Sequence, residues 1–445
     1  MRKNLLFLRS MLLLIVLFAA VFFFACTPKE NDDLQTEIPG KTKIEQEEIK
    51  DPPKVDNKAP VSVAQWVYKE TVLDEDGSIL FDLQFSYPEI LSSAEGSVDA
   101  VNEYYQNRFA DYAASILADG YEKAKSDKEA AAAGDYLFMP HAYSSTPGIY
   151  YNGNGLLSVV NELYEYTGGA HQTTYWRSET FDLETGQKLA LSDIFTGSKD
   201  EILESIYQLV LDQIEEQKGT DEFYYFDDYA DNVRKYYEEE DFFLTADGII
   251  FYYQPYAIAP HAAGLPMFKL PFDEAKTLAL DLTALPAAET EAKRILYERA
   301  QQLIDRNITA FCEIFGLAML ELEMPQDSLT EESLLPVKDD RFLNYADLES
   351  FVRSTYIKTE ADNLLANGRY HNVDGKLYAD ITTDAGMGYY IDWNSYGFAV
   401  SDLTESSAKL TIWVSEDSPA GEEELELTIK MIKENGTWLL EKMFY

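Results

Sequence analysis

Four histidines and two cysteines are the side chains of this sequence best suited to acid–base, nucleophilic or metal chemistry. His171 and His261 each lie in a short motif, and a metal bound there would need a third and a fourth ligand, which Asp or Glu could supply. The spacings H-E-x-x-H and H-x-x-x-H are both missing from the sequence, so we predict no metal and no other cofactor. We interpret His141 and His371, which have no motif around them, as structural residues.

Cys312 and the acidic residues offer the other routes to catalysis. A cysteine nucleophile needs a nearby histidine and a lowered pKa, and nothing around Cys312 indicates either, so we interpret it as a small buried apolar residue. Neighbouring carboxylates such as Asp227 and Asp228 could act as the acid and base of a glycosidase. With 79 acidic residues in the chain, chance neighbours are inevitable, and a solvated acidic surface is favoured. We therefore predict no catalytic residue and no enzymatic activity.

The charge of the chain narrows the classes of partner. Its 445 residues include 36 Lys and Arg against 79 Asp and Glu, for a net charge of −43. Nucleic-acid binding is excluded, because it needs an excess of positive charge to displace counterions from phosphates. Two interpretations of the acidity stay open: it attracts cationic partners, or it only keeps the protein soluble. The 31 tyrosines likewise fit either a platform for sugar rings or ordinary sheet residues.

The N-terminal residues have the pattern of an export signal. Arg2 and Arg9 precede an uncharged run at 11–25, which ends in a small residue directly before Cys26. This ending resembles a bacterial lipoprotein signal, which implies that the signal peptide, 1–25, is removed and that Cys26 is acylated. We predict a protein anchored by lipid at the outer face of the cytoplasmic membrane of a Gram-positive-type bacterium. The alternative is an uncleaved membrane anchor.

The remaining chain divides into a tether and folded segments. Residues 26–60 contain no aromatic residue and are rich in Pro, Lys, Glu and Asp, a composition that predicts a disordered tether. The patterns that follow predict an α+β fold, with antiparallel sheets packed with helices, in two or three domains after the tether. A helix is expected at 98–118, and the capping box Ser198–Glu201 predicts the start of another. The expected domains are 61–165, 166–285 and 288–445.

Two local motifs in the middle of the chain carry a family resemblance. The first is Tyr-Thr-Gly-Gly-Ala-His at 166–171, followed by characteristic segments at 181–187 and 191–195, and the second is Phe-Tyr-Tyr-Gln-Pro-Tyr-Ala-Ile-Ala-Pro-His-Ala-Ala-Gly at 251–264. Together they resemble the extracellular domain of RsiV-type anti-sigma factors and the non-catalytic N-terminal region of PdaC-type peptidoglycan deacetylases, over about 61–275. The anti-sigma member of that family binds lysozyme with this region, so the resemblance implies binding at the cell envelope. The sequence lacks the deacetylase domain and the cytoplasmic sigma-binding region, so neither whole-protein function is carried over.

We predict that the two motifs form the rim of a binding site, since loops held by a rigid scaffold often carry function. The alternative is that both motifs are internal structural turns. The predicted binding residues are Tyr166, Thr167, Gly168, Gly169, His171, Pro255, Tyr256, Pro260, His261 and Gly264.

The C-terminal segment resembles a second group of proteins. Asp347–Phe351, Lys358–Ala361 and Val373–Leu377 look like the IseA family of secreted DL-endopeptidase inhibitors, in which an acidic protein blocks the cleft of a hydrolase. The ending Lys433–Glu441 is similar both to that family and to the NTF2-like group. Within it, Asn435-Gly436 predicts a two-residue hairpin turn.

These observations lead to one functional hypothesis and two alternatives. We predict a cell-surface binding protein that senses or restrains a cell-wall hydrolase, lysozyme-like or a DL-endopeptidase, or that binds a peptidoglycan fragment. It would contact the membrane only through its lipid anchor and would bind no nucleic acid. One alternative is a small ligand in an NTF2-like cavity lined by Trp393, Tyr396 or Trp413. The other is a peptidoglycan-acting enzyme that pairs His171 or His261 with a carboxylate.

Overall fold

The computed structural model describes residues 59–91, 97–220, 224–280, 282–324, 333–382, 391–418 and 421–445. The predicted signal peptide, Cys26 and all but the last two residues of the predicted tether lie outside these ranges. The described part is an α+β structure whose sheets are mostly antiparallel and packed with helices, which confirms the predicted fold class. Within the described ranges, no helix combines the length and the apolar composition needed to cross a bilayer.

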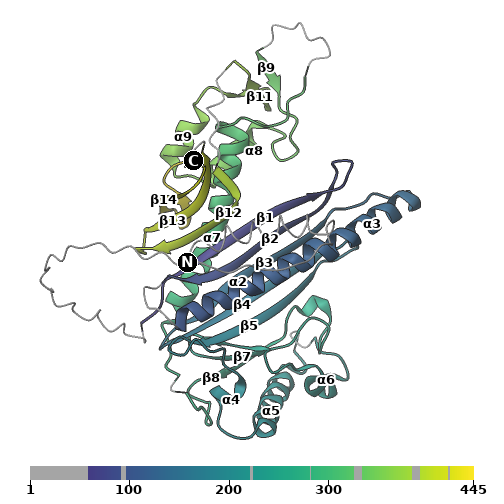
Figure 1. The fold of residues 1–445 in the computed structure, drawn as a ribbon, viewed down its shortest axis with the longest axis vertical. Helices are drawn as coiled ribbons and strands as arrows, with labels where there is room; N and C mark the ends of the chain where they lie inside the picture. The colour runs from purple at the N-terminus through teal and green to yellow at the C-terminus, as the bar shows by residue number, and fades with distance from the viewer. Residues whose placement is uncertain are drawn as a thin grey trace, which may run out of the picture.

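A nine-stranded sheet crosses the middle of the molecule, in the order β15-β14-β13-β12-β1-β2-β3-β4-β5 (Figure 1). All neighbouring strands are antiparallel except β2 and β3, which run parallel. The N-terminal strands are β1 (Val63–Leu73), β2 (Ile79–Ile90), β3 (His141–Gly153), β4 (Leu156–Tyr166) and β5 (Thr173–Asp182). The C-terminal strands are β12 (Ile391–Ser401), β13 (Ser407–Ser418), β14 (Gly421–Glu434) and β15 (Thr437–Leu440).

The pairing of β1 with β12 joins the two halves of this sheet. Gly397 of β12 stands opposite Trp66 of β1, and a Cβ atom at Gly397 would come within 2.9 Å of the indole ring. Glycine is therefore required for the backbone of β12 to approach this side chain closely. Strands from all three expected domains belong to this one sheet. Strand β4 of the first pairs with β5 of the second, and β1 of the first pairs with β12 of the third. The division into separate domains stays a prediction.

One face of the N-terminal strands is covered by a long helical segment, drawn across β3 and β4 in Figure 1. It consists of α2 (Ser97–Ser115), a π-helical turn (Ile116–Gly120) and α3 (Tyr121–Gly134). The predicted helix at 98–118 is confirmed. Val101 and Tyr105 are buried against the sheet, and the ring of Phe109 packs beside Phe85 and Tyr87.

The opposite face of β4 and β5 packs against a smaller unit. Its three-stranded sheet consists of β6 (Phe242–Thr245), β7 (Gly248–Tyr252) and β8 (Met267–Pro271). Its helices are α4 (Leu191–Ile194), α5 (Lys199–Gln217) and α6 (Tyr229–Tyr236). The predicted capping box is confirmed, because the Ser198 hydroxyl accepts from the amide of Glu201 while the Glu201 carboxylate accepts from the amide of Ser198. Val160 of β4, with Phe243 and Tyr252, forms the core between the two sheets.

The C-terminal half encloses a large apolar core. Its helices are α7 (Ala287–Ile308), which continues into a π-helical segment (Thr309–Phe315), α8 (Tyr345–Arg353) and α9 (Lys358–Leu365). A small sheet contains β9 (Leu334–Pro336), β10 (Tyr370–Val373) and β11 (Lys376–Asp380). Cys312 lies half-buried in the π-helical segment and packs against this core, and burial raises the pKa of its thiol. A raised pKa keeps the thiol protonated, which is the opposite of nucleophile activation.

Candidate functional site

The two sequence motifs come together at one end of strands β4 and β5. Residues 167–172 connect β4 to β5, and residues 253–266 connect β7 to β8. The imidazole rings of His171 and His261 stack, with centroids 5.7 Å apart and planes 25° apart. The ring of Tyr256 lies 5.8 Å from that of His261. The loops predicted to share a rim are therefore neighbours in space, and we call them the histidine loops.

The backbone of the histidine loops adopts conformations that few side chains tolerate. Gly168, Gly169 and Gly264 have φ angles of 88°, 92° and 69°. Tyr256 is 60% exposed and has φ 66°, in a region that costs a non-glycine residue about 1–3 kcal/mol. The exposed ring gains little from burial that would offset this cost. Packing of the Tyr256 ring therefore does not explain why this residue is held in the left-handed conformation.

The other predicted residues support the same loops. Tyr166, Thr167, Pro255 and Pro260 are half-buried, and the Tyr166 hydroxyl donates to the carbonyl of Gly169 over 3.3 Å. These residues shape the loops, whereas His171, Tyr256 and the glycines form their exposed part.

A glutamine holds the second histidine loop against the edge of the main sheet. The Gln254 Oε1 atom accepts from the backbone N–H of Trp176 at 3.2 Å, and its Nε2 atom donates to the carbonyl of Trp176 at 2.7 Å. A residue of a neighbouring strand would form the same two hydrogen bonds with the backbone of Trp176. The side-chain amide of Gln254 therefore takes the place of such a residue at the free edge of β5. Pro255 and Tyr256 follow directly, so this clamp fixes their position relative to β5.

A groove runs along β5 from this clamp. It encloses about 930 Å³, and Tyr175, Trp176 and Gln254 line it beside the histidine loops. Acidic residues outnumber basic ones in its lining. The acidic side chains are Glu165, Glu179, Glu238, Glu239, Glu240 and Asp241, and the basic ones are Arg108, Arg177 and Lys188. Three of the acidic side chains are paired: Glu179 with Arg108, Glu239 with Lys199, and Glu240 with Lys188, the last over 3.0 Å. We call this feature the acidic groove.

Asp241 is the most unusual carboxylate of the acidic groove. Only 6% of the residue is exposed, and its Oδ1 atom accepts from Gln254 Nε2 at 3.4 Å. Its Oδ2 atom is buried without a partner of hydrogen-bond geometry among the described residues. Burial raises the pKa of Asp241 to about 7, opposed by hydrogen bonding from Gln254 and Tyr252 and assisted by the charges of Glu238 and Glu240. This carboxyl group therefore titrates near neutral pH.

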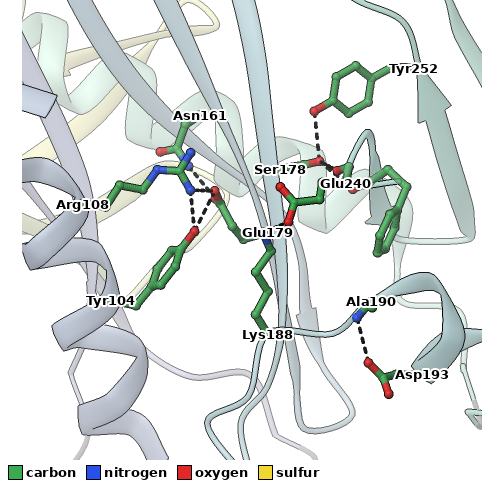
Figure 2. Close-up of polar contacts among 11 residues, drawn as sticks. Tyr104, Arg108, Asn161, Ser178, Glu179, Lys188, Ala190, Asp193, Glu240 and Tyr252 are labelled. Carbon is green, nitrogen blue, oxygen red and sulfur yellow. Dashed lines mark hydrogen bonds and ion pairs between the residues drawn. The ribbon is translucent and has the colours of Figure 1, made fainter. Parts of the chain in front are cut away.

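A buried ion pair fixes helix α2 on the face of β5 that is turned away from the smaller unit (Figure 2). Glu179 is 2% exposed and pairs with Arg108 of α2. Tyr104 donates to Glu179 Oε1 at 3.3 Å, and Asn161 Nδ2 donates to Oε2 at 2.9 Å. Burial raises the pKa of Glu179, and the charge of Arg108 opposes that shift. Both carboxylate oxygens are occupied, so the cluster positions α2 and is not arranged for catalysis.

The preceding residue, Ser178, points to the opposite face and ties the smaller unit to β5 (Figure 2). The Ser178 hydroxyl lies 2.9 Å and 2.6 Å from the carbonyl oxygens of Glu240 and Phe242, and 3.1 Å from the hydroxyl of Tyr252. The sequence analysis missed Arg108, Glu179 and Ser178, because their partners are distant in the chain and belong to no local pattern.

The histidines of the site show no arrangement for acid–base chemistry. In the part of the chain that the structure describes, neither His171 nor His261 forms an ion pair with a carboxylate, and no three His, Cys, Asp or Glu side chains are grouped to hold a metal. His141 is buried, with Nε2 3.3 Å from Asp127, and burial lowers its pKa. The Nε2 atom of His371 lies 2.8 Å from the carbonyl of Gly368.

Comparison with known proteins assigns two regions. Residues 75–174 match the family described as deacetylase PdaC, and residues 192–273 match a protein family of unknown function, DUF3298. No curated protein matches the chain. The PdaC part of the predicted resemblance is thus confirmed for these residues. The relations to RsiV-type anti-sigma factors and to the IseA family stay predictions.

Two solved structures are similar to about half of the chain. A DUF3298 family member from Bacteroides fragilis has 21% sequence identity and a TM-score of 0.39, and the match covers 53% of this chain and 100% of that one. A DUF3298 family protein from Pseudomonas aeruginosa has 15% identity and a TM-score of 0.37, covering 51% and 97%. Similarity at this level says nothing about how the elements of this chain are arranged. The two family matches suggest an extracellular, cell-wall-associated protein.

Proposed function

We propose that this protein is a cell-surface binding protein that docks a cationic cell-wall hydrolase and so senses or restrains it. The contact surface would consist of the histidine loops and the acidic groove beside them. One observation carries the proposal: two motifs from distant parts of the chain meet, and they present an exposed, strained Tyr256 next to stacked histidines. Aromatic side chains of this kind are frequent anchors at protein interfaces.

Electrostatics supports a cationic partner. The chain has a net charge of −43, and Glu238 and Glu239 line the acidic groove next to the buried Asp241. A surface of one sign raises the association rate of partners of opposite sign, and this effect weakens as salt screens the charges. Many wall hydrolases carry basic clefts, so an acidic groove is complementary to them.

We further propose that Cys26 carries the lipid anchor. The observation behind this proposal is the basic start, the apolar run and the small residue before Cys26. The wild-type protein should then partition into the membrane fraction and incorporate labelled fatty acid. Cys26→Ala should abolish the labelling, and equal labelling of both proteins would contradict the anchor.

The alternative of a ligand cavity in the C-terminal half receives no support from the described residues. Tyr396 is fully buried and donates to Asp305 at 2.6 Å, and Trp393 packs against Tyr396 and Phe444. The indole of Trp413 donates to a glutamate of the neighbouring strand at 3.0 Å. Trp393 and Tyr396 therefore fill a core, and the three residues do not surround a shared opening.

Binding should be measured directly between the full-length chain and a panel of a lysozyme and DL-endopeptidases, at low and at high salt. We expect salt-sensitive binding of at least one hydrolase, weakened about tenfold, or ~1.4 kcal/mol, by His261→Ala. His371→Ala is the matched control, because it is a second half-buried histidine far from the site in sequence. Failure of every hydrolase to bind, or equal weakening by both substitutions, would overturn the proposal.

A further inference from the structure

The clamp formed by Gln254 shares its side-chain amide with a buried carboxyl group. Gln254 Nε2 donates to the carbonyl of Trp176 at 2.7 Å and to Asp241 Oδ1 at 3.4 Å. An amide NH₂ group has two hydrogens, so it can serve both acceptors at once. Asp241 and the clamp therefore form one hydrogen-bonded unit between the second histidine loop and β5.

The backbone of Asp241 is fixed, so its side chain is the part that can respond to a change in charge. The backbone N–H of Asp241 donates to the carbonyl of Glu238 at 2.9 Å, and its carbonyl accepts from the amide of Tyr252 at 3.1 Å. The residue is 6% exposed, and its Oδ2 atom is buried without a partner of hydrogen-bond geometry among the described residues. Asp241 also lines the acidic groove, which gives the carboxyl group a route toward water.

No positive charge compensates Asp241. Lys188 pairs with Glu240 and Lys199 with Glu239, and no lysine or arginine of the described ranges forms an ion pair with Asp241. The elements packed around it contribute further charged and titratable groups, which are Glu238 and Glu240 of its own segment, Arg177, Glu179 and Lys188 of β5 and the loop that follows, Arg108 of α2, Tyr237 after α6, and Tyr252 and Tyr253 at the end of β7. Burial raises the pKa of all three tyrosines, so they stay neutral while Asp241 titrates.

Loss of the proton from Asp241 would leave a buried charge that has no counter-charge, which is costly in a site of low dielectric constant. Two responses reduce this cost. The carboxylate can draw Gln254 Nε2 away from the carbonyl of Trp176, because a charged acceptor forms the stronger hydrogen bond. It can also turn into the acidic groove, which removes one partner of the Gln254 amide. Either response disturbs the clamp.

The part of the loop that the clamp holds is the turn 254–257. The amide of Ala257 donates to the carbonyl of Gln254 at 3.1 Å, and Tyr256, with φ 66°, lies between them. The loop is anchored again directly after the turn, because Ile258 is fully buried. An open turn would relieve the strain at Tyr256, so the turn is ready to relax when the clamp weakens.

We propose that Asp241 and Gln254 form a pH-sensitive latch, in which the protonated carboxyl group keeps the clamp on Trp176 closed and loss of the proton opens it and frees Tyr256. Burial raises the pKa of Asp241 to about 7 in the closed form. The closed form thus holds the proton more tightly than an open form whose carboxyl group meets water. It is favoured at low pH and is lost as the pH rises through about 7.

As a way to regulate docking, the latch rests on the proposed function, because it moves one of the histidine loops. The latch itself can be measured in the protein alone, with no hydrolase present. A latch that opens in a chain that binds no hydrolase would overturn the proposed function and support the latch. Hydrolase binding by a chain without a pH-dependent clamp would do the reverse.

The test is hydrogen–deuterium exchange of the full-length chain at pH 5 and pH 8, resolved to single residues and corrected for the intrinsic effect of pH on amide exchange. The backbone amide of Trp176 reports the clamp directly, because it donates to Gln254 Oε1 at 3.2 Å. We expect the opening of this amide to increase at least about tenfold from pH 5 to pH 8. The increase should exceed any change at the amides of β13, which show whether the whole sheet opens.

Three variants separate the latch from other effects of pH. Asp241→Asn is an uncharged isostere, so the Trp176 amide should stay protected at both pH values. Gln254→Ala removes the clamp, so the same amide should exchange rapidly at both. Glu239→Gln is the matched control, because it removes one carboxylate from the same groove and should leave the response as in the wild type.

Histidines titrate in the same pH range, so the double variant His171→Gln/His261→Gln is a further control and should also respond as the wild type does. Equal opening of the wild-type clamp at the two pH values would overturn the latch. So would a wild-type response in folded Asp241→Asn or Gln254→Ala, or its loss in either control. Thermal unfolding of each variant shows whether the fold is intact, and Gln254→Ala keeps the test decisive if Asp241→Asn unfolds the protein.

Discussion

The two ends of the nine-stranded sheet differ in how completely their polar groups are satisfied. At the C-terminal end, Asn307 is fully buried and uses its side chain three times, with Tyr356, with the amide of Phe444 and with its carbonyl. At the other end, the buried hydroxyl of Tyr105 and the Oδ2 atom of Asp241 lack partners in the described structure. One sheet thus combines an end whose buried amide is fully hydrogen-bonded with an end that keeps buried polar atoms without partners in the described structure.

The same contrast appears in the backbone and the surface. Strained Tyr256, the stacked histidines and the acidic groove lie beside β4 and β5. The described core around Tyr396 is filled by side chains of α7 and β12 to β15. Functional sites often retain unsatisfied groups and strain that a scaffold would remove, at a cost in stability. The comparison therefore supports the proposal that binding takes place at the β5 end, while the other end stabilises the fold.

The largest loss of stability should come from a substitution in the core of the C-terminal half. Tyr396→Ala removes a fully buried ring and its hydrogen bond to Asp305, and we expect the free energy of unfolding to fall by about 3–5 kcal/mol. Urea denaturation measures the change. Tyr112→Ala, which removes a half-buried ring of α2, should cost clearly less. An equal loss for the two variants would remove the distinction between the two ends of the sheet.

A smaller loss is expected from the buried ion pair at β5. Arg108→Met leaves the Glu179 carboxylate buried without its partner, which should reduce the free energy of unfolding by roughly 3 kcal/mol. The double variant Arg108→Met/Glu179→Gln should recover part of that loss, because no charge remains buried. A double variant less stable than Arg108→Met would show that the pair does not act through its charge.

Asp241 should give the protein an unusual dependence on pH. Its pKa is raised to about 7 in the folded state, so the folded protein holds this proton more tightly than the unfolded chain does. The resulting stabilisation is fully present at low pH and is lost as the pH rises through about 7. Asp241→Asn removes this titration and should therefore raise the free energy of unfolding at pH 8 by roughly 2–3 kcal/mol.

The control for this titration is Asp247, in the turn between β6 and β7. A hydrogen bond with Lys269 lowers the pKa of Asp247, so its proton linkage has the opposite sign. Asp247→Asn should give no stabilisation at pH 8. Urea denaturation at pH 5 and pH 8 measures the free energy of unfolding of the wild type and of both variants. If Asp241→Asn changes that free energy equally at the two pH values, the pKa of Asp241 is not raised.

The smallest effect on stability is expected at the histidine loops. Tyr256→Gly relieves a φ of 66° but adds backbone entropy to the unfolded chain, so the free energy of unfolding should change by less than about 1 kcal/mol. Binding of a captured hydrolase should nevertheless weaken at least about tenfold. A variant that becomes clearly less stable, or that binds as the wild type does, would show that Tyr256 is a structural residue.

Local patterns predicted much of the secondary structure. The helix at 98–118, the capping box of Ser198 and the turn at Asn435-Gly436 are all formed, the last with φ angles of 50° and 83°. Each of these depends on residues close together in the chain, whose conformational preferences act before any tertiary contact forms.

The pairing of strands could not be predicted in the same way. Strand β1 pairs with β12, which is distant in the sequence, and Gly397 opposite Trp66 shows its purpose only when the two strands are side by side. For the site, the motifs indicated which loops to examine. Arg108 with Glu179, and Asp241 with Gln254, became visible only through burial and distance.

The most direct test of the account is hydrogen–deuterium exchange of the full-length chain, with and without a hydrolase that it binds. Assigning binding to the β5 end predicts that the partner slows exchange at 167–172 and 253–266, while β12 to β15 exchange at the same rate as in the free protein. Protection confined to the C-terminal strands, with unchanged histidine loops, would contradict it.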